Sequence, residues 1–333
     1  MKRGLVLLAL LLAGCSDGAA PLAPSGDVPA KITLAWVSAT ASQAVAWLAY
    51  EGGYFQQNGL DVTLQYIETS PVAAAALVNG GVQFVQMAGP AVVAANLGGA
   101  HQVMLMGFVN EPLFILVANP DITRPEELRG KTVAVTRVGS SDDFMLRQAL
   151  TNWGLQPDVD VKITSVPATQ GRVASFTQGL VQGVMAGVTE ELPLTRAGGH
   201  VLIRTADLGL PYQAAGLAST RDYVQAHPDI TSRVVKAMTQ GVHRYKTDKP
   251  FAEKMLSKYI KLDDPAALDA NYKAYVDVFP RAPAPTLEGM QQVAKELAAG
   301  GQSAPAAGVA AMVDPSFVRQ LEDSGFIRQL YGG

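Results

Sequence analysis

The segment RPEELRGKTVAVTRVGSSDDFMLRQALTNWGL (residues 124–155) decides the fold, because it restarts a pattern that the chain has already used once. After a short helical turn, the apolar run at 131–136 predicts a buried strand, and the following glycine and serines predict a tight turn. Apolar residues at helical spacing then predict a helix over 141–153. A strand, a turn and a helix in this order open a second α/β unit.

The first unit precedes this segment and shows the same alternation of strands and helices. Strands are predicted at 31–38, 61–68, 82–88, 101–109 and 112–120, and helices at 42–59, 71–81 and 90–99. The last two strands are expected to pair across a short turn that contains Asn110 and Glu111. This alternation of strands and helices favours an α/β fold with a mainly parallel sheet.

The second unit continues beyond residue 155, and the chain then becomes mostly helical. Strands are predicted at 161–167, 182–189 and 200–207, and helices at 171–180, 232–248, 250–260 and 265–279. Crossovers near 117–120 and 208–216 divide the chain into lobe I (31–118 and 213–333) and lobe II (119–212). Because open α/β sheets bind ligands beyond the carboxyl ends of their strands, two facing lobes predict a ligand cleft between them.

The N-terminus has the layout of a secretory signal. Lys2 and Arg3 precede the apolar run LVLLALLLA at 5–13, which is too short to span a bilayer. The tetrapeptide LAGC, ending at Cys15, resembles the bacterial lipobox, in which the cysteine is lipidated and becomes the first mature residue. The sequence therefore predicts a signal peptide over 1–14, a tether over 15–30, and a membrane-anchored protein in the periplasm or on the cell surface.

Composition and motifs narrow the function class. The net charge is −3 and the basic residues are scattered, so binding to nucleic acid is not expected. Cys15 is the only cysteine, which excludes an internal disulfide. The four histidines are widely spaced, and no nucleotide, metal or hydrolase motif is present, so we expect neither a cofactor, nor a metal site, nor an enzyme.

Three segments resemble the substrate-binding proteins of nitrate, sulfonate and taurine ABC importers, a family that includes thiamine-pyrimidine precursor proteins. They are AYEGGYFQQNGLDVTL (49–64), PEELRGKTVAVTRVGSS (125–141) and VQGVMAGVTEELP (181–193). The resemblance covers about 31–290. It implies a type II periplasmic-binding-protein fold with lobe II inserted into lobe I. It also implies capture of a small molecule and its delivery to an ABC permease and its ATPase. We expect the protein to be a monomer. The chain departs from the family at 184–187, where VMAG replaces an acidic VDA motif.

Candidate ligand-binding residues follow the strands, where polar side chains and helix N-termini meet. Backbone N–H groups at such N-termini favour an anion or a carbonyl oxygen, although Ser42 and either Ser140 or Ser141 can also serve as helix caps. The candidates in lobe I are Ser38, Thr40, Ser42, Gln43, Thr69, Ser70, Met87, Gly89, Asn110 and Glu111. Those in lobe II and at the return crossover are Gly139, Ser140, Ser141, Thr169, Gln170, Arg172, Thr189, Glu190 and Tyr212.

The identity of the ligand stays open at this point. An inward-facing Arg137 or Arg172 would favour a sulfonate-like or taurine-like anion. The apolar residues around Met104 and Met106 allow a less polar ligand, and the family also includes pyrimidine carriers. A protein that presents its bound ligand to a membrane sensor would use the same clamp.

Overall fold

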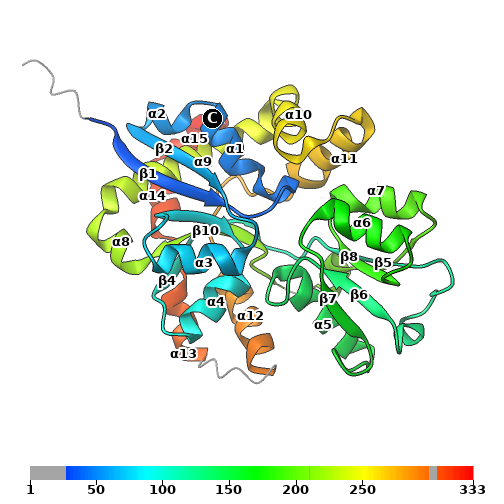
Figure 1. The fold of residues 1–333 in the computed structure, drawn as a ribbon. Coiled ribbons are helices and arrows are strands. Elements are labelled where there is room, and N and C mark those ends of the chain that lie inside the picture. The colour runs from blue at the N-terminus through cyan, green and yellow to red at the C-terminus, as the bar shows by residue number, and fades with distance from the viewer. Residues whose placement is uncertain (1–27, 210, 300–305, 333) are drawn as a thin grey trace, which may run out of the picture.

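The computed structural model describes residues 28–209, 211–299 and 306–332, which form two α/β lobes side by side (Figure 1). The predicted two-lobed α/β fold is confirmed. The predicted signal peptide, the lipidation site at Cys15 and most of the tether lie outside the described residues. Within the described part, no helix has the length and apolar character needed to cross a membrane.

Lobe I is built on a five-stranded sheet in the order β2-β1-β3-β10-β4. Strands β2, β1 and β3 are parallel, with Leu34 opposite both Leu64 and Phe84, whereas β10 runs antiparallel to β3 and β4. Its strands are β1 (Ala30–Trp36), β2 (Leu60–Tyr66), β3 (Phe84–Met87), β4 (Gln102–Val109) and β10 (Ala215–Thr220). The helices that connect them are η1 (Ala41–Gln43), α1 (Ala44–Glu51), α2 (Tyr54–Gln57), α3 (Ser70–Val78) and α4 (Gly89–Leu97).

The predicted single helix over 42–59 is wrong in its continuity. A 3-10 turn precedes α1, and α1 ends at Glu51, before two glycines. Gly53 has a φ of +71°, a left-handed conformation that side-chain-bearing residues rarely adopt. The glycine pair therefore ends α1 and lets α2 start in a new direction.

Lobe II is built on a second five-stranded sheet, in the order β7-β6-β8-β5-β9. Its strands are β5 (Ile115–Ala118), β6 (Thr132–Val135), β7 (Lys162–Ser165), β8 (Gly183–Ala186) and β9 (His200–Arg204). Its helices are η2 (Pro125–Leu128), α5 (Ser141–Asn152), α6 (Thr169–Thr177), α7 (Val188–Arg196) and η3 (Thr205–Leu208). The strand, turn and helix predicted from the opening segment are present as β6, the Gly139 turn and α5.

The predicted pairing of strands 101–109 and 112–120 is wrong. β4 pairs with β10 in lobe I, whereas β5 lies between β8 and β9 in lobe II. The chain therefore crosses between the lobes at residues 110–114, and β5 belongs to the second sheet rather than to lobe I as predicted. Both strands are fully buried, so their local sequences carry no alternation that would identify their partners.

The chain returns to lobe I between Leu208 and Ala215, where β10 enters the first sheet, and then forms a helical shell. α9 packs so closely on α1 that a Cβ at Gly241 would lie 2.7 Å from the Val45 carbonyl oxygen. These helices are α8 (Arg221–Ala226), α9 (Pro228–Thr247), α10 (Lys249–Leu256), η4 (Ser257–Lys261), α11 (Pro265–Val276), α12 (Leu287–Ala299), α13 (Ala306–Val309), η5 (Ala310–Met312), α14 (Ser316–Asp323) and α15 (Phe326–Leu330).

Candidate functional site

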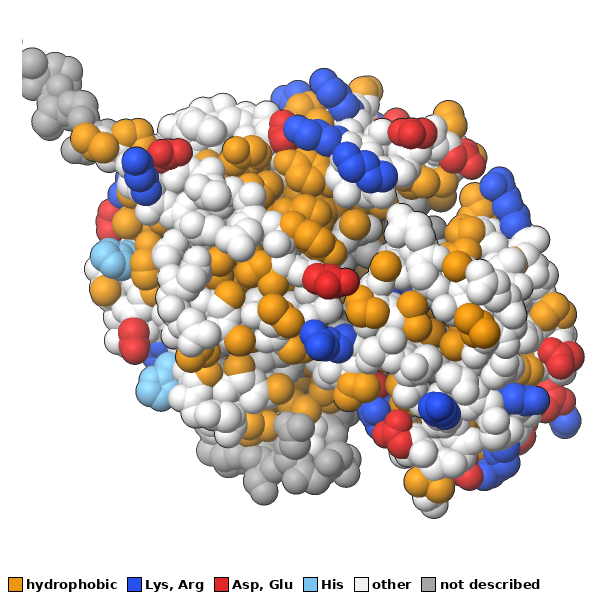
Figure 2. Space-filling model, viewed as in Figure 1, with side chains coloured by type: hydrophobic (Ala, Val, Ile, Leu, Met, Phe, Trp, Pro, Cys, Tyr) orange, Lys and Arg blue, Asp and Glu red, His pale blue; other side chains and the backbone are white. Residues whose placement is uncertain are grey.

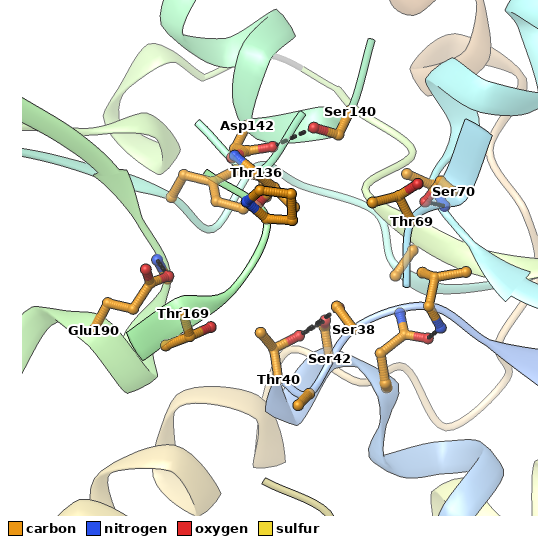
Figure 3. Close-up of a pocket in the computed structure, with 18 of the residues that line it drawn as sticks. Ser38, Thr40, Ser42, Thr69, Ser70, Thr136, Ser140, Asp142, Thr169 and Glu190 are labelled. Carbon is orange, nitrogen blue, oxygen red and sulfur yellow. Dashed lines mark hydrogen bonds between the residues drawn. The ribbon is translucent and has the colours of Figure 1, made fainter. Parts of the chain in front are cut away.

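A cavity of about 220 Å³ lies between the two lobes. Figure 2 shows hydrophobic side chains gathered beside the line where the lobes meet on this face. Figure 3 shows hydroxyl and carboxylate side chains from both lobes around the cavity. Eleven of the predicted ligand-binding residues line it: Ser38, Thr40, Ser42, Gln43, Thr69, Ser70, Ser140, Thr169, Gln170, Arg172 and Glu190.

Two predicted residues at the end of β3 do not line the cavity. Met87 is fully buried in the core, and the Gly89 backbone N–H donates to the Gln213 carbonyl oxygen. A Cβ at Gly89 would lie 2.7 Å from that oxygen. The returning chain therefore covers this strand end, because β10 enters the sheet next to β3.

Four other predicted residues also lie away from the cavity lining. Asn110 donates to the Ala284 carbonyl oxygen (3.1 Å), Glu111 is exposed, and Tyr212 is fully buried. Gly139 lines a separate shallow groove beside α3 and α4.

For two further predicted residues only the backbone is described. Ser141 and Thr189 lie in the first turns of α5 and α7, and their side chains are outside the described part of the chain.

The lobe I wall presents a chain of hydroxyl groups. The Thr40 hydroxyl lies 3.0 Å from that of Ser38 and 2.9 Å from that of Ser42. The predicted cap at Ser42 is wrong, since neither η1 nor α1 has a side-chain cap and Ser42 lies inside η1. These hydroxyls can each donate or accept, so this wall imposes no charge preference on a ligand.

A second part of the lobe I wall follows β2. The Ser70 hydroxyl accepts from the Ala88 N–H (3.3 Å), which ties the start of α3 to the end of β3. The Thr69 hydroxyl accepts from Arg137 Nη1 (3.3 Å), and this bond joins lobe I to lobe II. Arg137 itself is not among the residues that line the cavity.

The lobe II wall contains a buried ion pair. Arg172 donates from Nε to Glu190 Oε1 (2.7 Å) and from Nη2 to Glu190 Oε2 (2.9 Å). Its other three N–H groups go to the carbonyl oxygens of Val166 and Pro167 and to the hydroxyl of Thr169. A guanidinium has five N–H donors, so every donor of Arg172 is bonded to an oxygen atom of the protein.

Burial acts on both charges of this pair. It raises the pKa of Glu190 above its usual value, and the Arg172 guanidinium opposes that rise. Burial alone would lower the pKa of Arg172, but the carboxylate of Glu190 raises it overall, with a smaller contribution from Asp142. The guanidinium therefore stays charged. Removal of either partner would leave a buried charge without a counter-charge and would lower the stability of the fold.

The N-terminus of α5 is occupied by two acidic side chains. Asp142 accepts from the Thr136 N–H and from the Ser140 hydroxyl (2.6 Å). Asp143 accepts from the Gly139 N–H (2.9 Å) and from Arg147 (2.9 Å), and burial nevertheless raises its pKa. Only Asp142 lines the cavity. Ser140 is the N-cap residue by position, but its hydroxyl makes no cap bond and donates instead to Asp142.

The residues that sequence reasoning missed are mainly apolar and aromatic. Tyr66, at the end of β2, lines the cavity and packs against Trp36 with ring centroids 4.4 Å apart. Leu113 and Phe114 come from the crossover between lobes, and Ile260 and Tyr275 from the C-terminal helices. Tyr66 was detectable as an aromatic residue at a strand end. The others have no local signal, because tertiary packing alone brings them to the cavity.

No group of three or more His, Cys, Asp or Glu side chains with metal-binding geometry occurs among the described residues. The lining residues thus combine apolar walls, hydroxyl groups, one buried ion pair and two further carboxylates, Glu68 and Asp142. Such a cavity can desolvate a small molecule and orient it by hydrogen bonds.

The sequence of this chain matches a protein family and a curated protein. Residues 25–260 match the model of the NMT1-like family. A taurine-binding periplasmic protein of Escherichia coli (strain K12) is 24% identical over 197 residues, which make up 58% of this chain and 60% of that protein. The alignment thus spans less than two thirds of the relative's own length.

Solved structures share the fold. One from Bordetella bronchiseptica RB50 superposes with a TM-score of 0.78 at 20% identity and covers 89% of this chain and 98% of its own. An alkanesulfonate-binding protein of Xanthomonas axonopodis pv. citri, bound to MOPS, has a TM-score of 0.73 at 19% identity, with 86% of this chain and 99% of that chain covered.

Proposed function

The chain belongs to the NMT1-like family, and from that premise we propose that it is a lipid-anchored solute-binding protein of an ABC importer. It captures a small organic molecule between its lobes and delivers it to a permease and its ATPase. The observation that carries this proposal is the interlobe cavity, which eleven side chains chosen from the sequence help to line. The relatives named above bind taurine and alkanesulfonate, which supports binding rather than catalysis as the role.

Opening and closing of the two lobes accounts for capture and release. Two connections join the sheets, and polar contacts between the lobes include the following two among the described residues. Arg137 bonds to Thr69, and Arg196 on α7 lies 3.7 Å from Asp264, just before α11. Both contacts are single and at least partly exposed, so they hold the lobes together weakly. A ligand that touches both walls favours the closed form by its differential affinity for that form.

Membrane attachment completes the proposal. A lipidated Cys15 would hold the protein at a membrane surface in the periplasm or at the cell exterior, and the tether to Ala30 would let the lobes reach a permease. Intact-mass measurement of the mature chain tests this part, because lipidation and cleavage before Cys15 give a defined mass. Size-exclusion chromatography with light scattering tests the expected monomer.

A ligand screen with a cavity-blocking variant tests the main proposal. We would follow thermal unfolding of the detergent-purified full-length chain against sulfonates, taurine, nitrate, aminopyrimidines, aromatic carboxylates and neutral apolar compounds. A compound at 100 times its Kd stabilises by about 2.7 kcal/mol. Ala168→Trp fills the cavity from an exposed position, and Ala206→Trp places the same side chain on exposed η3 outside it.

We expect at least one compound to stabilise the wild-type chain and Ala206→Trp but not Ala168→Trp. Stabilisation that survives in Ala168→Trp would locate binding elsewhere. Absence of stabilisation by every compound class would contradict the proposed function.

A further inference from the structure

We propose that the ligand presents N–H donors or a positive charge to the lobe II wall, as an amine-bearing or amidine-bearing organic compound does, and is not an oxyanion. This inference rests on the proposed function and names the ligand class of the same cavity. It sets the protein apart from the relatives named for taurine and alkanesulfonate.

The first argument is that Arg172, the cationic side chain among the described lining residues, has no N–H donor left for a ligand. All five N–H groups of Arg172 are bonded to protein oxygens, two of them to the carboxylate of Glu190. An oxyanion would have to displace Glu190 from a buried, bidentate pair to reach the guanidinium. The displaced carboxylate would then lose both of its charge-assisted bonds to Arg172.

The second argument is that two lobe II helices beside the cavity, α5 and α7, carry carboxylates of the protein in their own first turns. Asp142 and Asp143 lie in the first turn of α5 and accept from backbone N–H groups of the turn before it. Glu190 accepts from the Gly187 N–H at the start of α7 (3.2 Å). A helix N-terminus attracts an anion, and at α5 and α7 the protein's own carboxylates weaken that attraction.

The third argument is the charge balance of the lining. Glu68, Asp142 and Glu190 are acidic and Arg172 is the basic member, so the ionised lining carries three negative charges against one positive charge. If Arg137, which bonds to the lining residue Thr69, is counted as well, one negative charge remains in excess. Like charges repel each other more strongly at the buried Asp142 than at the exposed Glu68, so this balance opposes an anion and favours a donor or a cation.

The fourth argument is that acceptors remain for such a ligand. Asp142 is 3% exposed, and each of its oxygens accepts one hydrogen bond from the groups named above. A carboxylate oxygen has two lone pairs, so Asp142 can accept further N–H groups from a ligand. Figure 3 shows Asp142 and Thr136 across the cavity from the hydroxyls of Ser38, Thr40 and Ser42. Apolar side chains from both lobes complete the enclosure of the ligand body.

Three probes with one phenyl ring and different charge test the inference. They are benzamidine (cationic), benzamide (neutral) and benzenesulfonate (anionic), each titrated calorimetrically into the full-length chain. We expect benzamidine to bind at least about tenfold more tightly than benzenesulfonate, because its N–H groups make charge-assisted bonds to Asp142. Ala168→Trp is expected to abolish this binding.

Matched variants separate the cavity carboxylate from its neighbour. Asp142→Asn should weaken benzamidine about tenfold and leave benzamide nearly unchanged. Asp143→Asn makes the same change one residue away, outside the cavity lining, and should weaken benzamidine far less than Asp142→Asn does. If Asp142→Asn does not fold, Glu68→Gln replaces it, since Glu68 is exposed and lines the cavity.

Each outcome has one meaning. Tighter binding of benzenesulfonate than of benzamidine, lost in Ala168→Trp, would overturn this inference and leave the proposed function standing. Binding of benzamidine that neither Asp142→Asn nor Glu68→Gln weakens would also overturn it. If none of the three probes binds but taurine or another anion from the earlier screen does, the inference fails and the proposed function holds. Failure of every compound in both experiments would overturn both.

Discussion

Replacement of Glu190 by glutamine tests the buried ion pair of lobe II most directly. Glu190→Gln keeps the shape and one carbonyl acceptor but removes the negative charge beside Arg172, whose exposed fraction is 3%. Loss of one partner from a buried pair costs about 3–5 kcal/mol. Three of the five Arg172 N–H groups keep their acceptors, so we expect the lower end, about 3 kcal/mol, or a fall of about 6–12 °C in the unfolding midpoint.

Urea unfolding followed by tryptophan fluorescence measures this loss, and Trp153 at the end of α5 reports on lobe II. The control is Glu191→Gln, which breaks the more exposed pair with Arg204 and should cost less than about 1 kcal/mol. The double variant Arg172→Met/Glu190→Gln should be more stable than Glu190→Gln alone, because no buried charge is left without a partner.

The same variant links the ion pair to ligand choice. In Glu190→Gln, Arg172 loses its counter-charge and can turn donors toward the cavity, so benzenesulfonate should bind this variant more tightly than it binds the wild-type chain. The reasoning on the pair is refuted if Glu190→Gln costs no more than Glu191→Gln. The reasoning on the ligand is refuted if the variant folds and gains no affinity for the anion.

Three further outcomes are expected. Gly241→Ala should destabilise the chain by about 1–3 kcal/mol in thermal unfolding, because the new methyl would force α9 away from α1, whereas Gly308→Ala has open space and should change stability by less than about 0.5 kcal/mol. Burial alone would raise the pKa of Glu51, but hydrogen bonds, chiefly from Lys258, lower it below the usual 4.5. The stability that Glu51 contributes is therefore present above that pH and lost as the pH falls through the lowered pKa, so wild-type and Glu51→Gln stabilities should converge in acid. Arg196→Ala removes one contact between the lobes and should weaken ligand binding by less than about fivefold in calorimetry, while small-angle scattering of the unliganded chain shifts toward a more open form.

Much of the site was predictable because strand ends are local features. Ser38 and Thr69 follow β1 and β2, and Thr169 opens α6 shortly after β7; all three line the cavity. The prediction failed at β3, where Met87 and Gly89 occupy the equivalent place. There the returning chain at Gln213 covers the strand end, an event that depends on a segment more than 120 residues away.

The prediction for Arg172 likewise failed where it depended on a contact with a distant residue. A basic residue at a strand end predicted an inward-facing group for an anion, and Arg172 does line the cavity. The structure shows that Glu190 already holds it, from a helix 18 residues later. Residue type and position located the guanidinium correctly, but only the folded chain shows which acceptor it contacts.

The sequence by itself determined the two α/β units, the restart of the pattern after residue 124, and the cleft between the lobes. These features depend on hydrophobic periodicity and glycine turns, which are patterns among neighbouring residues. Only the tertiary structure decided that β5 pairs with β8 and β9, and that Arg172 gives every donor to the protein. A buried strand exposes no face that marks its partner, and a buried charge is balanced by whichever opposite group the fold brings near. Both depend on contacts between distant parts of the chain.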